Sequence, residues 1–132
     1  MQNPKIKMQN DKAKFKKEFK ERVYRFILRL IEFIDGLPKD GCSKLIGDQL
    51  LRSGTSIGAN YIESLASSSK KDFTNFFTHS LKSANESKFW LALLRDTGRA
   101  KAEDCQRLLQ GLSEIANILA TSILTLKGRR QS

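Results

Sequence analysis

The sequence predicts an all-α protein that folds as an antiparallel, up-down-up-down bundle of four helices. Apolar residues recur every three or four positions in four segments of roughly 25 residues, which is the period of an α-helix. The chain has two prolines, and none lies between residues 39 and 132. Short stretches containing glycine, serine or proline separate the segments, so that consecutive helices are expected to pack side by side in opposite directions.

The first helix is indicated by a regular apolar row and by a stop signal at Gly36 and Pro38. A second row of isoleucines widens its apolar face beyond a single stripe. The main row consists of Phe15, Phe19, Val23, Phe26, Leu30, Phe33 and Leu37, and the second of Ile27, Ile31 and Ile34.

The remaining three helices are bounded by capping signals. Asp40 or Ser43 suits the start of the second helix, which is expected to run to about Ala66. Ser69 followed by Asp72 resembles a capping box before the third helix, and Gly98 suits its end. The fourth helix has Cys105, Leu108, Leu112, Ile115, Leu119, Ile123 and Leu126 in near-heptad register and is expected to end at Gly128. The predicted organisation is therefore a flexible tail at residues 1–11, the bundle at 12–127 and a C-terminal tail at 128–132.

The middle of the second helix is poor in large side chains. Gly47, Gly54 and Gly58 fall inside its apolar arc, although a glycine within a helix costs about 1 kcal/mol relative to alanine. Close packing of a neighbouring helix would compensate that cost. The alternative is three uncompensated weak points.

A polar arc runs along the same helix and includes Gln49, Arg52, Ser56, Asn60 and Glu63. Arg52 and Glu63 are three turns apart, about 16 Å, and cannot pair with each other. Glu86 and Lys88 of the third helix are candidate partners. This arc is either a solvated face or a hydrogen-bonded rail against another helix.

Positive charge is concentrated near the N-terminus. The chain carries a net charge of +10, and residues 1–25 hold nine Lys or Arg against three Asp or Glu. Such asymmetry favours a polyanionic partner, either nucleic acid or an anionic membrane surface, although it also serves solubility. Phe15 and Phe19 interleave with the lysines as stacking residues would, but their helical spacing predicts a place in the core. The candidate phosphate-binding residues are Lys12, Lys14, Lys16, Lys17, Lys20, Arg22 and Arg25.

No enzymatic site is predicted. His79 is the single histidine, Cys42 and Cys105 are far apart, and no spacing pairs a nucleophile with a base. We therefore expect no metal, no cofactor and no small-molecule substrate. A membrane partner is not expected either, because a bundle should bury the apolar face of the basic first helix. The N-terminus has no apolar signal region and no apolar run approaches the length of a membrane span, so the expected location is the cytoplasm, with both thiols reduced.

The motifs of the second and third helices resemble a known family. QLLRSGTSIGANYIE is similar to the second-helix signature of the four-helix-bundle proteins encoded by intervening sequences of bacterial 23S rRNA genes, and the likeness covers roughly residues 15–126. Ser53, Gly54, Ser64 and Ser67 depart from the family pattern, and Ser67 removes a cation that the turn often carries. The matching positions are Gln49, Arg52, Ser56, Ile57, Asn60, Glu63, Ser69, Lys71, Phe73, Ala84, Glu86, Trp90 and Leu91.

This resemblance implies a barrel-like homopentamer of four-helix bundles. Relatives of the family include the accessory variability determinant of diversity-generating retroelements, a basic pentamer that binds nucleic acid and a reverse transcriptase. In that setting we favour a structural rail for the Arg52–Glu63 arc. The expected function is a non-enzymatic oligomeric scaffold that binds nucleic acid, with RNA the expected kind, and with little sequence specificity. The alternative is an accessory module that docks a protein such as a reverse transcriptase without binding nucleic acid itself.

Overall fold

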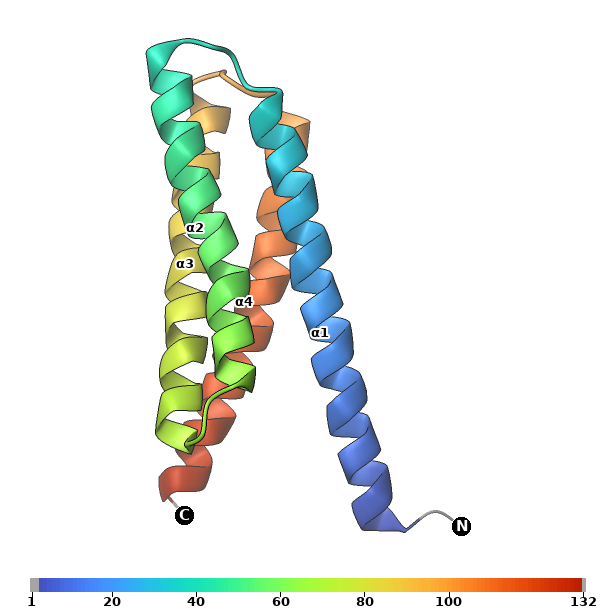
Figure 1. Ribbon diagram of the computed structural model, residues 1–132. Coiled ribbons are helices and arrows are strands. Elements are labelled where there is room, and N and C mark those ends of the chain that lie inside the picture. Colours follow the sequence, from blue (N-terminus) through green and yellow to red (C-terminus); the bar gives the residue numbers. More distant parts are fainter. Residues whose placement is uncertain (1–2, 132) are drawn as a thin grey trace.

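A computed structural model describes residues 3–131 of the chain, with side chains as far as Gly128. These residues form four helices and no strand: α1 (Pro4–Asp35), α2 (Gly41–Leu65), α3 (Lys70–Asp96) and α4 (Ala102–Gln131). Figure 1 shows that consecutive helices run in opposite directions, with the start of α1 and the end of α4 at the same end of the bundle. The predicted all-α, antiparallel four-helix bundle is confirmed.

The helix boundaries follow from local capping. Asp40 caps α2 by accepting a hydrogen bond from the backbone N–H of Ser43 at 2.9 Å, and Ser69 caps α3 by accepting one from Asp72 at 3.1 Å. Gly98 follows α3 with a φ of +69°, a left-handed conformation that glycine adopts without steric cost. Asp40 also forms an ion pair at 3.7 Å with Arg99, which joins the two links at that end of the bundle.

Two helix ends differ from the sequence prediction. α1 begins at Pro4, so residues 4–11 are helical where a flexible tail was expected. Asn3 accepts a hydrogen bond from the Lys5 N–H at 2.9 Å, and proline is well suited to the first position of a helix because its missing donor has no helical partner there. α4 does not end at Gly128 but continues to Gln131, since a single glycine lowers helix propensity without preventing a helix.

One core runs between the helices. It is built from the predicted apolar rows, and Leu30, Leu50, Leu91, Leu112 and Leu119 at its centre are fully buried. By length and composition Ala102–Gly128 of α4 also meets the requirements for crossing a membrane. The core helix of a bundle meets the same requirements, and the predicted heptad face of α4 packs into this core from Cys105 to Ile123.

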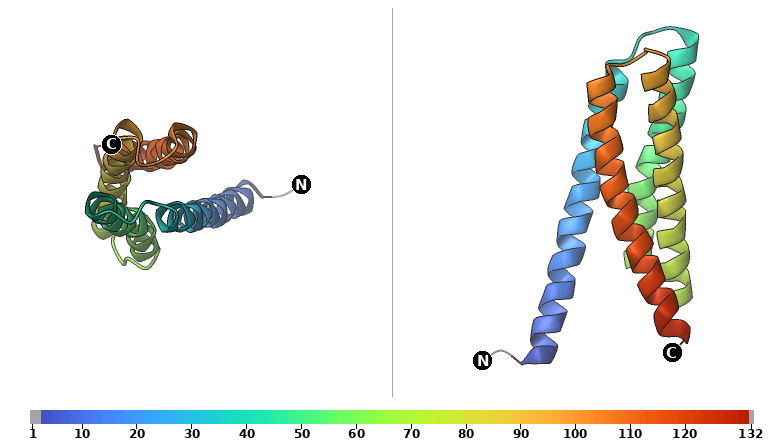
Figure 2. Two further views of the ribbon diagram at one scale, coloured as in Figure 1. Left: turned by 90° about the horizontal axis from the view of Figure 1, so that it is seen from above. Right: turned by 180° about the vertical axis from the view of Figure 1, so that it is seen from behind.

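The four helices do not pack equally closely. α2 and α3 share the most extensive contact, whereas α1 contacts α4 sparingly. Figures 1 and 2 show α1 diverging from the other three helices toward its N-terminal end. Residues 4–18 of α1 are all exposed, and the first buried residue is Phe19. Phe15 is 46% exposed, so the prediction that it belongs to the core is wrong, while the same prediction for Phe19 is confirmed.

Candidate functional site

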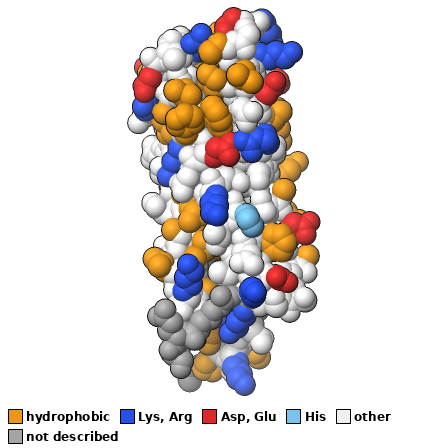
Figure 3. Space-filling view, turned by 90° about the vertical axis from the view of Figure 1, so that its left-hand side faces the viewer, with side chains coloured by type: hydrophobic (Ala, Val, Ile, Leu, Met, Phe, Trp, Pro, Cys, Tyr) orange, Lys and Arg blue, Asp and Glu red, His pale blue; other side chains and the backbone are white. Residues whose placement is uncertain are grey.

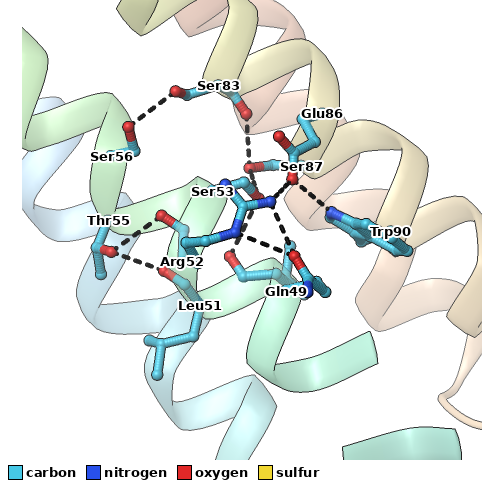
Figure 4. Close-up of polar contacts among 11 residues, drawn as sticks. Gln49, Leu51, Arg52, Ser53, Thr55, Ser56, Ser83, Glu86, Ser87 and Trp90 are labelled. Carbon is cyan, nitrogen blue, oxygen red and sulfur yellow. Dashed lines mark hydrogen bonds and ion pairs between the residues drawn. The ribbon is translucent and has the colours of Figure 1, made fainter. Parts of the chain in front are cut away.

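A polar network joins α2 to α3 at the predicted polar arc (Figure 4). The Arg52 guanidinium donates to Glu86, and it also donates twice to Gln49 Oε1, at 3.0 and 2.9 Å. The Trp90 indole N–H donates to the same Glu86 carboxylate at 2.9 Å. The hydrogen bond from Trp90, together with the bond and charge of Arg52, lowers the pKa of Glu86 below its ordinary value of 4.5, although partial burial opposes the shift. Glu86 is therefore ionised at neutral pH and cannot act as a general acid there.

Serine side chains extend this network along the interface. Ser53 and Ser87 hydroxyls lie 2.8 Å apart and are buried, and Ser83 donates to Ser56 at 2.9 Å. Ser80 donates to the Ile57 carbonyl at 2.8 Å. Because small hydroxyl side chains bridge the two helices at successive turns, α2 and α3 approach closely and in a fixed register.

The far end of the arc is organised differently. Asn60 donates to the backbone carbonyl and to the hydroxyl of Ser56, both at 2.9 Å. Glu63 is exposed, and it forms no ion pair or side-chain hydrogen bond within the part of the chain that the structure describes. Within the predicted arc, Arg52 and Ser56 bond to α3, whereas the bonds of Asn60 stay within α2. Glu86 is the predicted partner that Arg52 meets, and Lys88 forms no ion pair with Glu63 among the described residues.

Three of the glycines of α2, Gly47, Gly54 and Gly58, face α1 and the link that follows it. A Cβ at Gly54 would overlap the Cδ2 atom of Leu30, which is fully buried. A Cβ at Gly58 would lie 2.8 Å from Ile27, and one at Gly47 would lie 3.1 Å from Leu37. In each case a side chain, and not backbone, occupies the space that the glycine leaves; Leu37 belongs to the link after α1, and the others belong to α1.

All seven candidate phosphate-binding residues lie on α1 with exposed side chains. Three of them have acidic neighbours. Lys14 lies 3.8 Å from Glu18, Arg25 lies 3.9 Å from Glu21, and Arg22 forms a 3.0 Å ion pair with Glu114 of α4.

The other four, Lys12, Lys16, Lys17 and Lys20, form no ion pair with a described residue. Lys12, Lys16 and Lys20 are spaced by four and therefore share one side of the helix. The structure thus divides the seven basic residues into three with acidic neighbours and four without. Three of the four, Lys12, Lys16 and Lys20, form a row along one side of α1.

The sequence predicted Ser56 as part of the polar arc, but not the other interhelix serines or the role of Trp90. The signal was present, because Ser80, Ser83 and Ser87 of α3 follow helical spacing and so do Ser53 and Ser56 of α2. It was not decisive, since serines at such spacing also occur on solvated faces. Within residues 3–128, no group of three or more His, Cys, Asp or Glu side chains could hold a metal ion.

Fold and polar network together define an all-α bundle protein whose best-connected polar residues join two neighbouring helices. The chain belongs to the 23S rRNA-intervening sequence protein family, whose model matches residues 16–121. The family predicted from the second-helix signature is therefore confirmed.

A solved structure from Bacteroides thetaiotaomicron is similar to this chain. It is described as a protein with unknown function from the S23 ribosomal protein family, and it is 33% identical with a TM-score of 0.75. The match covers 80% of this chain and 97% of the solved one. No curated protein matches this chain.

Proposed function

We propose that this protein is a non-enzymatic oligomeric scaffold that binds nucleic acid, most favourably RNA, through the basic surface of α1. The observation that supports this most strongly is the row of Lys12, Lys16 and Lys20, which is exposed and has no acidic partner among the described residues. Lysines that are not neutralised within the chain are available to displace counterions from phosphates. Contacts to phosphates carry no base readout, so the binding has little sequence specificity.

Binding is tested by fluorescence anisotropy with a labelled, structured RNA at low salt. The expected result is a saturable rise in anisotropy that weakens steeply as salt is added, with an unlabelled RNA of unrelated sequence competing equally well. Flat anisotropy at low salt would exclude nucleic-acid binding.

The proposed self-association is supported by an apolar groove between α1 and α2. The groove has a volume of about 580 Å³, and Tyr24 and Ile62 on its walls are 64% and 44% exposed. Leu28 and Ile31 continue the exposed apolar surface along α1. Apolar surface of this kind in a soluble bundle is typical of an interface. The homopentamer that the family resemblance implies would use it as a head-to-tail contact that closes into a ring. Several copies would multiply a weak phosphate contact.

Light scattering after size exclusion tests the assembly. Five chains of 15.0 kDa would give 75 kDa. Ile62→Lys is expected to lower the mass, because a charge in the groove opposes its burial. Leu124→Lys is the matched control, since Leu124 is 71% exposed and lies on α4, outside the groove. A wild-type mass of one chain would contradict the proposal.

The second candidate function is docking of a protein partner, such as a reverse transcriptase. Figure 3 shows hydrophobic side chains gathered over the upper part of the face formed by α2 and α3. Leu45 and Phe89 are 61% and 56% exposed. The Phe89 ring lies edge-on to that of Trp90, with 5.0 Å between the ring centroids. Aromatic residues of this kind are enriched at the centres of protein interfaces.

A pull-down with nuclease-treated extract separates this candidate from the first. Docking through the α2–α3 face predicts that a protein is retained after nuclease treatment and is lost with Phe89→Ser. A partner lost on nuclease treatment alone would instead be bound through nucleic acid.

A further inference from the structure

A cleft opens between the N-terminal half of α1 and the rest of the bundle. Its volume is about 780 Å³, and its walls come from all four helices. The inner wall is largely apolar and includes Tyr61, Phe73 and Ile118, whereas α1 contributes Lys12, Phe15 and Lys16. Figure 2 shows that α1 diverges from the other helices toward its N-terminal end, on the side where this cleft lies.

Phe15 is the exposed end of a series of aromatic rings that leads into the core. Its ring is nearly parallel to that of Phe19, with an interplanar angle of 10° and 6.1 Å between centroids. The ring centroids of Phe19 and Tyr61 are 4.9 Å apart, and those of Tyr61 and Phe77 are 5.7 Å apart. Phe19 and Tyr61 are almost completely buried, so Phe15 rests on a fixed support. The cleft therefore presents a positioned aromatic ring beside two lysines.

The charges of the cleft favour an anionic occupant over a second copy of this chain. Lys12 and Lys16 have no acidic partner among the described residues, and Asp11 is the one carboxylate on the walls. None of the four helices carries net negative charge: α2 has two basic and two acidic residues, and in α1, α3 and α4 the basic residues exceed the acidic ones. A helix from a second copy would thus bring no net negative charge to these lysines.

We infer that this cleft seats unpaired nucleotides, with a base stacked on Phe15 and the flanking phosphates bound by Lys12 and Lys16. The inference rests on the proposed nucleic-acid binding and adds the form of nucleic acid to it. A basic groove that carries aromatic rings is the usual construction of a site for single strands, since every base offers a flat face for stacking. Bases in a duplex are already stacked and paired and do not reach such a ring. The cleft therefore favours single-stranded over double-stranded RNA.

The test compares a labelled 20-nucleotide oligouridine with a labelled RNA duplex of equal length in the same buffer. Wild-type protein is expected to bind the single strand more tightly. Phe15→Ala should weaken single-strand binding by about 5- to 150-fold, the range for loss of one stacked base, and should leave duplex binding unchanged. Phe15→Trp should restore the preference. Phe89→Ala is the matched control, because Phe89 is 56% exposed on α3 and lies outside the cleft.

The lysines are tested with equal changes of charge. Lys12→Ala with Lys16→Ala should weaken single-strand binding more than Lys14→Ala with Lys17→Ala, since the first pair lines the cleft and the second does not. If RNA binds but Phe15→Ala has no effect and neither strand form is preferred, the inference is wrong and the proposed function stands. If neither RNA binds, both fail. If Phe15→Ala lowers the mass of the assembly in light scattering without changing single-strand affinity, the cleft is an interface between copies and the inference is wrong.

Discussion

Glu86 is the residue on which the polar network between α2 and α3 converges. Its carboxylate accepts hydrogen bonds from Arg52 and Trp90, and both donors favour its charged form. The side chains of Arg52 and Glu86 are 57% and 36% exposed, so water screens much of their attraction. The network therefore fixes the register of the two helices more than it adds to their stability.

Glu86→Gln is expected to lower the free energy of unfolding at neutral pH by about 0.2–1 kcal/mol, the range measured for exposed ion pairs. The melting temperature should fall slightly as a result. The pKa of Glu86 is lower in the folded protein than the unfolded value of 4.5, so its contribution is complete above that value. It is lost as the pH falls through the folded pKa. Thermal melts from pH 7 to pH 3 should thus show the difference between wild type and variant shrinking in acid. A difference that grows in acid would contradict this assignment.

Gly54 tests close packing at a single residue. Gly54→Ala should destabilise the protein by about 1–3 kcal/mol, because the added Cβ overlaps the buried Leu30 and forces repacking. Gly128→Ala is the control: it meets no atom within 4 Å and should gain up to about 1 kcal/mol from helix propensity. Denaturant unfolding measures both. If both variants are more stable than wild type, α1 does not pack closely against Gly54.

At the scale of elements, α1 combines two halves with different roles. From Phe19 onward it supplies core residues, and its side chains fill the space beside Gly54 and Gly58 of α2. Residues 4–18 bury no side chain. A helix of about this length is only marginally stable without tertiary contacts. A bound partner along this half would therefore stabilise it.

Hydrogen exchange followed by mass spectrometry checks this description of α1. Amides in residues 4–18 are expected to exchange much faster than those of α2 and α3, since they lack buried contacts. Addition of single-stranded RNA should slow exchange in this segment before any other. If exchange there is unaffected by saturating RNA, nucleic acid does not bind along this part of α1.

The helices themselves were largely predictable, because period, caps and breakers agreed at each link. Asp40, Ser69 and Gly98 act at the positions that their residue types suggested. The start of α1 was missed because a run of lysines gives no apolar period, although Asn3 and Pro4 form an ordinary helix start. Phe15 was assigned to the core because its spacing continues the buried row, and spacing does not reveal that α1 diverges from α4 there.

For the whole molecule, we propose an oligomeric bundle in which the divergence of the basic helix α1 opens a cleft. The candidate site was predictable as a set of lysines, because charge is read directly from the sequence. Which lysines lack acidic partners depends on three-dimensional neighbours such as Glu114, which is 92 residues from the Arg22 that it pairs with. The cleft depends on the tilt of one helix, which no local pattern encodes.

The most direct test of the central claim is the salt dependence of single-stranded RNA affinity for two triple variants of equal charge. Lys12, Lys16 and Lys20 are changed to alanine in the first, and the exposed Lys44, Lys82 and Lys101 in the second. Each phosphate contact contributes about 0.7 to the slope of log K against log salt for single strands, so the first variant should lose about 2 from the wild-type slope. The second should keep nearly the whole slope. Equal losses in the two variants would mean that overall charge, and not the basic row of α1, governs binding, which would contradict the account.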